Sequence, residues 1–88
     1  MNRTKYLVYI KDDNEHSIVF PALLGHDEMA VQMKAEGVLG AGFCSFDLNK
    51  DGILEVKCSG KSTSLNLESR PEDTLRVTVD YLGFNYEP

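Results

Sequence analysis

The sequence predicts an α+β fold: an antiparallel sheet of about five strands with two helices packed on one face, in the order β-β-α-β-β-β-α. Three observations support this prediction. Several short segments alternate apolar and polar residues with the period of two that strands show. Two other segments carry the start and stop signals of helices. The links between neighbouring strand segments are short and rich in turn-forming residues, which favours antiparallel pairing.

The first two predicted strands form a hairpin near the N-terminus. Residues 5–12 are rich in aromatic and β-branched side chains, which favour extended backbone. The polar residues 12–15 have the composition of a turn. Residues 16–21 are then the returning strand, and Pro21 marks its end or an edge position.

A short helix is expected over residues 27–36. Asp27 and Glu28 are favourable near a helix N-terminus, and Gly37 suits the left-handed residue after the last turn. Its buried stripe is expected to consist of Met29, Ala30 and Met33, with Leu23 or Leu24 packing from the preceding loop.

A second hairpin is expected from residues 40–48 and residues 54–58. Asn49 to Gly52 suits a type I turn followed by a left-handed glycine, the usual three-residue hairpin connection. This turn fixes the register. Three apolar pairs then lie on one face and two polar pairs on the other: Cys44 with Cys58, Phe46 with Val56, Leu48 with Leu54, Asp47 with Glu55, and Ser45 with Lys57.

Residues 47–58 also match the first eight positions of an EF-hand calcium loop. The twelfth position, which should be a bidentate Glu, is Cys58, and the segment before the loop is a poor helix former. The sequence therefore favours a hairpin, with at most weak cation affinity at this turn.

The C-terminal part is expected to contain one more strand and a second helix. Residues 62–69 alternate, with Leu65 and Leu67 facing inward. A helix over residues 70–82 is indicated by several signals: Ser69 as the cap, Glu72 completing a capping box, Pro71 in the first turn, and a stop at Gly83 with Phe84 folding back on the last turn. Residues 75–81 also alternate as a strand would, and the capping signals favour the helix.

Size and composition favour one ordered domain, residues 1–88, in the cytoplasm. The chain has 42% hydrophobic and 26% charged residues, enough apolar surface to offset chain entropy. No apolar run approaches the ~20 residues that span a bilayer, and the N-terminus turns acidic where a signal peptide would present its cleavage site.

The net charge of −5 disfavours binding to nucleic acid and to anionic membranes and favours a basic protein partner. Homo-oligomer formation is left open.

The two cysteines are expected to be buried free thiols. A directly opposed cross-strand pair has a spacing that a disulfide tolerates, but a cytoplasmic chain normally keeps such thiols reduced. Zinc is poorly supported because Cys44 and Cys58 lack the short paired spacings of structural sites. No cofactor or metal is expected.

Two functional hypotheses follow. The preferred one is a non-catalytic, protein-binding factor whose surface includes Phe43, Ile53 and Glu55, where two apolar residues stand on an otherwise wet face. The alternative is a small metal-dependent or acid/base enzyme centred on His26, Asp27 and Glu28 at a helix start. No second ligand cluster or activated nucleophile accompanies this group, so we expect no catalytic residue here.

The segments "IVFPALLGHDEMA", "VLGAGFCSF" and "CSGKSTSLNLESRPEDT" together resemble a type of short, uncharacterised bacteriophage or prophage protein. The resemblance spans roughly residues 16 to 82. It implies no particular activity. Small acidic phage proteins often act by binding other proteins, so the resemblance implies an accessory factor of that kind.

Overall fold

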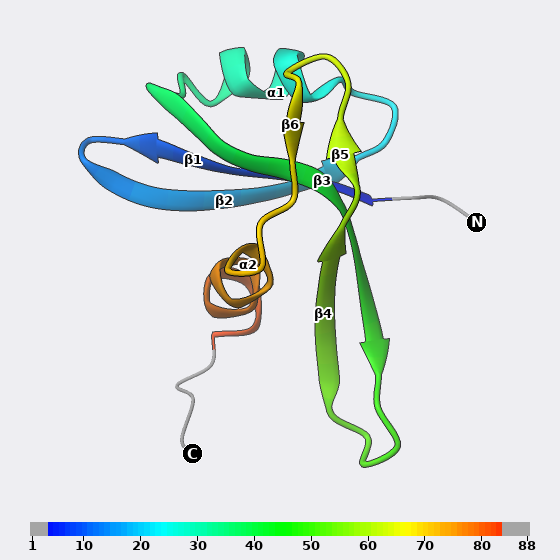
Figure 1. Ribbon diagram of the computed structural model, residues 1–88. Helices are drawn as coiled ribbons and strands as arrows, with labels where there is room; N and C mark the ends of the chain where they lie inside the picture. Colours follow the sequence, from blue (N-terminus) through cyan, green and yellow to red (C-terminus); the bar gives the residue numbers. More distant parts are fainter. Residues whose placement is uncertain (1–3, 84–88) are drawn as a thin grey trace.

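The computed structural model of the chain describes residues 4–83 and contains six strands and two helices within that range (Figure 1). The elements are β1 (Thr4–Lys11), β2 (Asn14–Pro21), α1 (His26–Gln32), β3 (Gly37–Leu48), β4 (Leu54–Ser59), β5 (Lys61–Ser62), β6 (Leu67–Glu68) and α2 (Asp73–Leu82). The predicted α+β class and the order of the helices among the strands are confirmed.

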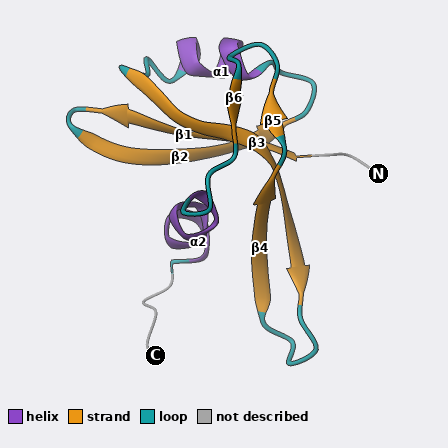
Figure 2. Ribbon diagram, viewed as in Figure 1, coloured by secondary structure: helices purple, strands orange, loops and turns teal. Residues whose placement is uncertain are grey.

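Four strands form one antiparallel sheet in the order β2-β1-β3-β4, and β5 and β6 form a separate small hairpin (Figure 2). The expectation of one strand over residues 62–69 is wrong, because the chain turns back at residues 63–66. Asn66 takes the left-handed conformation there, with φ 55°. Asparagine tolerates this conformation, so the turn closes without a glycine. Leu65 and Leu67 still pack toward the core, as expected.

The long strand β3 belongs to two ladders. Its first part pairs with β1 and its last part with β4, and only Phe43 and Cys44 pair with both. The far end of β3 and β4 therefore leaves the rest of the sheet as a two-stranded ribbon, which points away from the body of the molecule (Figure 1). We call the end of this ribbon, residues 47–55, the ribbon tip.

The two helices lie on opposite faces of the sheet, which corrects the expectation that both pack on one face (Figure 1). The cause is β1, in which all four residues from Tyr6 to Tyr9 are buried. A strand that is apolar on both sides needs cover on both. Leu7 and Tyr9 pack with α1, while Tyr6 and Val8 pack with Val77 of α2.

The register predicted for the β3–β4 hairpin is confirmed at all five pairs, including Cys44 opposite Cys58. The Asn49 amide donates to the Ile53 carbonyl at 2.9 Å, and Gly52 takes the left-handed conformation with φ 77°. The Asn49 side-chain oxygen also accepts from the amides of Asp51 (2.8 Å) and Ile53 (3.0 Å). These bonds make the segment a hairpin turn.

The first hairpin is also confirmed, with a shorter turn than expected. Asp12 and Asp13 alone form the loop, at φ 54° and 66°. Positive φ at both residues is the backbone of a type I′ turn, which matches the twist of the two flanking strands.

Helix α1 is shorter than the predicted 27–36. The chain leaves the helix at Lys34, which is left-handed with φ 55°, in place of Gly37. The Glu36 amide then donates to the Ile10 carbonyl at 2.8 Å, so the chain already joins β1 where the helix was expected to continue. The buried stripe of Met29, Ala30 and Met33 is confirmed. The expected packing of Leu23 or Leu24 against this stripe is wrong, since both side chains are exposed.

Helix α2 is a helix and not a strand, and it begins at Asp73, three residues later than expected. The predicted capping box is absent: Glu72 is the N-cap residue and makes no side-chain cap bond, and the Ser69 hydroxyl lies 3.5 Å from the Ala41 carbonyl. The Asp73 carboxylate accepts from the Arg70 amide, which precedes the helix, at 3.0 Å. The stop at Gly83 is confirmed by its φ of 64°. Phe84 lies outside the described residues.

Candidate functional site

The three residues predicted to form a binding surface do not lie together. Ile53 and Glu55 are exposed at the ribbon tip. Phe43 is half-buried near the base of the ribbon, with its ring centre 6.1 Å from that of His26. Phe43 pairs with Ser59, six residues from Ile53 along the ribbon, which corresponds to roughly 20 Å. One partner surface would therefore have to be long to contact all three.

The ribbon tip itself exposes three large apolar side chains. Leu48 is 70% exposed, and Ile53 and its neighbour Leu54 are also exposed. Across the ribbon, Asp47 stands opposite Glu55, a like-charge pair that costs a little stability. Within residues 4–83 no group of three or more His, Cys, Asp or Glu is placed to hold a metal ion.

The residues of the enzyme hypothesis, His26, Asp27 and Glu28, point in different directions. His26 is 3% exposed, and its Nε2 lies 2.9 Å from the Gly42 carbonyl oxygen in the interior. Asp27 and Glu28 are exposed, and the Glu28 carboxylate accepts from the Gly25 amide at 2.6 Å. The imidazole and the two carboxylates thus do not converge on a point where a substrate or a metal could be held.

The two carboxylates instead line a shallow groove on the outer side of α1, which we call the α1 groove. Its volume is about 470 Å³. Its walls combine apolar and acidic side chains and one amide: Leu24, Asp27, Glu28, Met29, Val31 and Gln32. Val31 is 78% exposed, and Leu23, directly before Leu24, is 96% exposed. Such exposure of large aliphatic side chains beside a groove is typical of an interaction surface.

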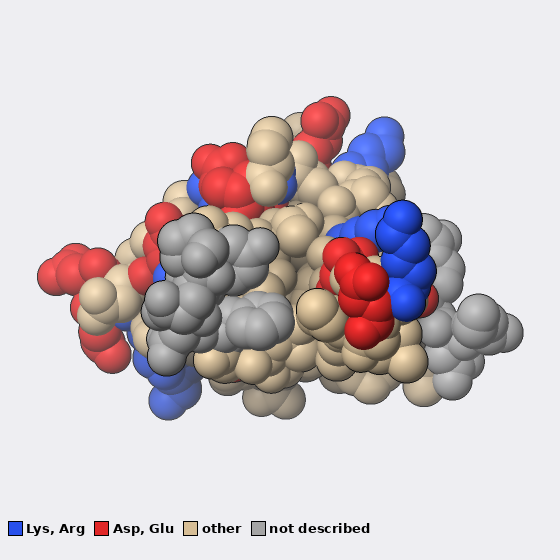
Figure 3. Space-filling view, turned by 90° about the horizontal axis from the view of Figure 1, so that it is seen from below, with Lys and Arg blue, Asp and Glu red and all other residues tan. Residues whose placement is uncertain are grey.

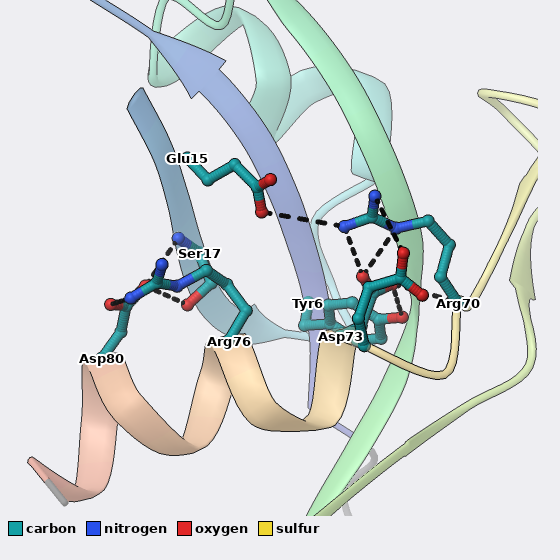
Figure 4. A network of polar contacts seen from close by, with 8 residues as sticks. Tyr6, Glu15, Ser17, Arg70, Asp73, Arg76 and Asp80 are labelled. Atoms are coloured by element: carbon teal, nitrogen blue, oxygen red, sulfur yellow. Dashed lines mark hydrogen bonds and ion pairs between the residues drawn. The ribbon is translucent and has the colours of Figure 1, made fainter. Parts of the chain in front are cut away.

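A buried polar network holds α2 against the sheet (Figure 4). The Tyr6 hydroxyl donates to Asp73 Oδ2 at 2.6 Å, and Arg70 Nε donates to Asp73 Oδ1 at 2.8 Å. The Asp73 carboxylate is fully buried and reaches β3 at Gly40, where a Cβ atom would collide with Asp73 Oδ2. Burial and the bond to Asp73 raise the pKa of Tyr6. With its carboxylate engaged and enclosed in this way, Asp73 serves to position α2.

The sequence does not predict this network, which joins a residue of β1 to the first residue of α2. The spacing Arg70-x-x-Asp73 was a signal for a local ion pair, which the structure contains at 2.8 Å. Nothing in the sequence indicates that Tyr6, 67 residues away, supplies the third group.

The two cysteines are free thiols, Cys44 buried and Cys58 half-buried, close to what was expected. Burial is the main cause that raises the pKa of Cys44 to about 12 and that of Cys58 to about 11. These thiols are poor nucleophiles at neutral pH, because the thiolate is the reactive form.

The charges on the α2 side of the molecule are scattered. Acidic and basic side chains lie next to each other in small groups that uncharged residues separate, and the described residues on this face form no continuous basic patch (Figure 3). That distribution lacks the electrostatic footprint of a phosphate-binding surface. Within the described range, the structure contains no helix long and apolar enough to cross a membrane.

No family model, curated protein or solved structure matches the chain. The resemblance to phage-type proteins stays a prediction.

Proposed function

We propose that this protein is a non-catalytic accessory factor that binds another protein, and that the partner contacts the α1 groove with apolar and basic side chains. The observation that carries the proposal is the exposure of Leu23 (96%) and Val31 (78%) beside a groove whose two charged side chains, Asp27 and Glu28, are both acidic. Apolar side chains of the partner would gain by burial against Leu24 and Val31.

The charge of the partner follows from the groove and from the whole chain. Asp27 and Glu28 are the charged side chains among those that line the groove, and the chain carries a net charge of −5. A basic partner is therefore attracted at long range and in contact, while an acidic one is repelled in both. This attraction should weaken as salt is added, because exposed charges are screened.

A direct test uses three short synthetic peptides that share the same leucines and differ only in their charged residue: lysine, glutamate or neutral glutamine. We expect the leucine–lysine peptide to shift the amide NMR signals of residues 24–32, and the glutamate peptide to leave them in place. A preference for the glutamate peptide, or shifts centred on another surface, would contradict the proposal.

Variants locate the surface. Leu24→Ser combined with Val31→Ser removes apolar surface from the α1 groove, and we expect it to abolish binding of the leucine–lysine peptide. The matched control is Leu48→Ser combined with Ile53→Ser at the ribbon tip, where the exposed apolar residues are comparable. If the groove variant still binds the peptide and the ribbon variant does not, the binding surface is the ribbon tip and the proposal is contradicted.

A further inference from the structure

His26 joins the start of α1 to the middle of β3. It is the first residue of the helix, and its ring stands edge-on to those of Phe20 and Phe43, at centre distances of 5.6 and 6.1 Å and an angle of 84° in both cases. Its Nε2 lies 2.9 Å from the Gly42 carbonyl oxygen. A carbonyl only accepts, so Nε2 carries the proton and Nδ1 is unprotonated in the neutral ring.

The surroundings of this ring disfavour a charge. Burial lowers the pKa of His26, and the Gly42 carbonyl opposes that change. Lys5 of β1 lowers the pKa further, and Asp27 of α1 raises it. The other groups against the ring, Phe20 of β2 and Phe43 of β3, are uncharged.

We propose that protonation of His26 releases the first turn of α1 from β3, so that the α1 groove forms fully only while this imidazole is neutral. A proton on Nδ1 would create a second buried donor, whereas among residues 4–83 the ring has one hydrogen-bond partner, the Gly42 carbonyl. Moving the turn outward brings the imidazolium into water. Leu24, Asp27 and Glu28 lie within two residues of His26, so the groove wall would move with it.

The direction of the pH effect follows from the lowered pKa. In the released state His26 titrates near its ordinary value of 6.5 and in the packed state below it. The packed state is therefore fully favoured above that value and loses stability as the pH falls through it. The consequence for partner binding rests on the proposed function, but the release of α1 does not.

The test compares wild type with two single variants. His26→Gln keeps a donor for the Gly42 carbonyl and removes the titration. His16→Gln is the control, because the chain has two histidines and this variant leaves His26 as the remaining one. Amide hydrogen exchange of residues 26–32, corrected for the intrinsic effect of pH, is measured at about pH 7.5 and about pH 5.

We expect acidification to cause a several-fold loss of protection in α1 of wild type and His16→Gln, with β1 unchanged, and no loss in His26→Gln. Equal loss in His26→Gln, or unchanged protection in wild type, would overturn the inference. Binding of the leucine–lysine peptide separates the two proposals. If the peptide binds at neither pH, the proposed function is contradicted and the pH switch is not. If it binds equally strongly at both pH values, the pH switch is contradicted and the proposed function is not.

Discussion

Among single residues, Gly40 allows α2 to pack closely against the sheet because it has no side chain. Asp73 places its carboxylate directly over this glycine, where it meets the Tyr6 hydroxyl and the Arg70 guanidinium. A buried carboxylate is tolerated only when it is paired and hydrogen-bonded, and the bond to Tyr6 of β1 forms only when α2 packs closely against the sheet. The absence of a side chain at position 40 is thus a condition for the network.

Gly40→Ala should therefore destabilise the protein. The added Cβ would collide with Asp73 Oδ2 and would lie 2.9 Å from Asp73 Cγ. We expect the free energy of unfolding in urea to fall by about 1–3 kcal/mol, the usual cost of overpacking. The control is Gly37→Ala, since a Cβ there meets nothing within 4 Å. Equal stability of the two variants would mean that the contact over Gly40 does not constrain α2.

The cysteine pair should react slowly in the folded protein. With pKa values of about 12 for Cys44 and about 11 for Cys58, both thiols are almost wholly protonated near pH 8. We expect an aromatic disulfide reagent to modify them much more slowly than in urea, as followed by absorbance. Variants Cys44→Ser and Cys58→Ser assign the two rates, and rapid modification of Cys44 in native buffer would count against its burial.

The same pKa shifts make stability depend on alkaline pH. Each thiol has an ordinary pKa of 9.0 and a raised one in the fold, so the folded state is stabilised below about pH 9 and loses this contribution as the pH rises through 11 and 12. The loss should be smaller in the Cys44→Ser variant, which urea titrations at several pH values would detect.

Among the secondary-structure elements, the β3–β4 hairpin is held by hydrogen bonds within its own turn. Asn49 supplies one backbone amide and a side-chain oxygen that together bind three groups of the turn: the Ile53 carbonyl, the Asp51 amide and the Ile53 amide. Gly52 supplies the positive φ. Because all of these contacts are local, the register of the ribbon needs no help from the rest of the fold.

Asn49→Ala should loosen this turn without changing the core. The substitution removes the side-chain bonds to the amides of Asp51 and Ile53 and to the Glu55 carboxylate. Their loss should cost about 1 kcal/mol, since water replaces part of the interaction. We expect this fall in the free energy of unfolding together with faster amide exchange at Asp51 and Ile53. Lys50→Ala, in the same turn, is the control and should change stability by less than about 0.5 kcal/mol. Identical exchange in the two variants would argue that the Asn49 side chain is dispensable.

At the scale of the whole molecule, α2 covers both edges of the four-stranded sheet. Near its start the Thr74 hydroxyl accepts from the Cys58 amide of β4 at 3.1 Å. Near its end Asp80 Oδ2 and the Tyr81 hydroxyl accept from the β2 amides of Ser17 (2.9 Å) and Val19 (2.8 Å). Unpaired edge amides are templates for strand pairing between molecules, so we expect α2 to limit such pairing as well as completing the core.

Thr74→Val tests this role. The substitution keeps the shape of the side chain and leaves the partly buried Cys58 amide without its acceptor, which should cost about 1–3 kcal/mol. The control is Thr78→Val, because the Thr78 hydroxyl donates only to the Thr74 carbonyl within the helix and should cost less than about 0.5 kcal/mol. Urea unfolding gives the difference, and light scattering should reveal added association for Thr74→Val. Equal effects of the two substitutions would reject edge protection by Thr74.

The candidate site was only partly readable from the sequence. Asp27 and Glu28 were recognised as a charged group and the buried stripe of α1 was identified, so the outward direction of Val31 was implied. The sequence did not predict that Leu23 and Leu24 are exposed, because an apolar pair beside a helix normally packs inward. Whether such a pair packs inward depends on the path of the loop across the sheet, and the alternation of strand residues does not indicate that path.

The features that could be predicted from the sequence are local: the two hairpins, the register that sets Cys44 against Cys58, the inner stripe of α1 and the end of α2 at Gly83. These features depend on turn chemistry and periodicity within a few residues. Tertiary structure alone decided that the helices take opposite faces, that Asp73 meets Tyr6 and that α2 covers both sheet edges. Such contacts join distant segments, and they are selected by which apolar surfaces and unpaired backbone groups remain once the strands have paired.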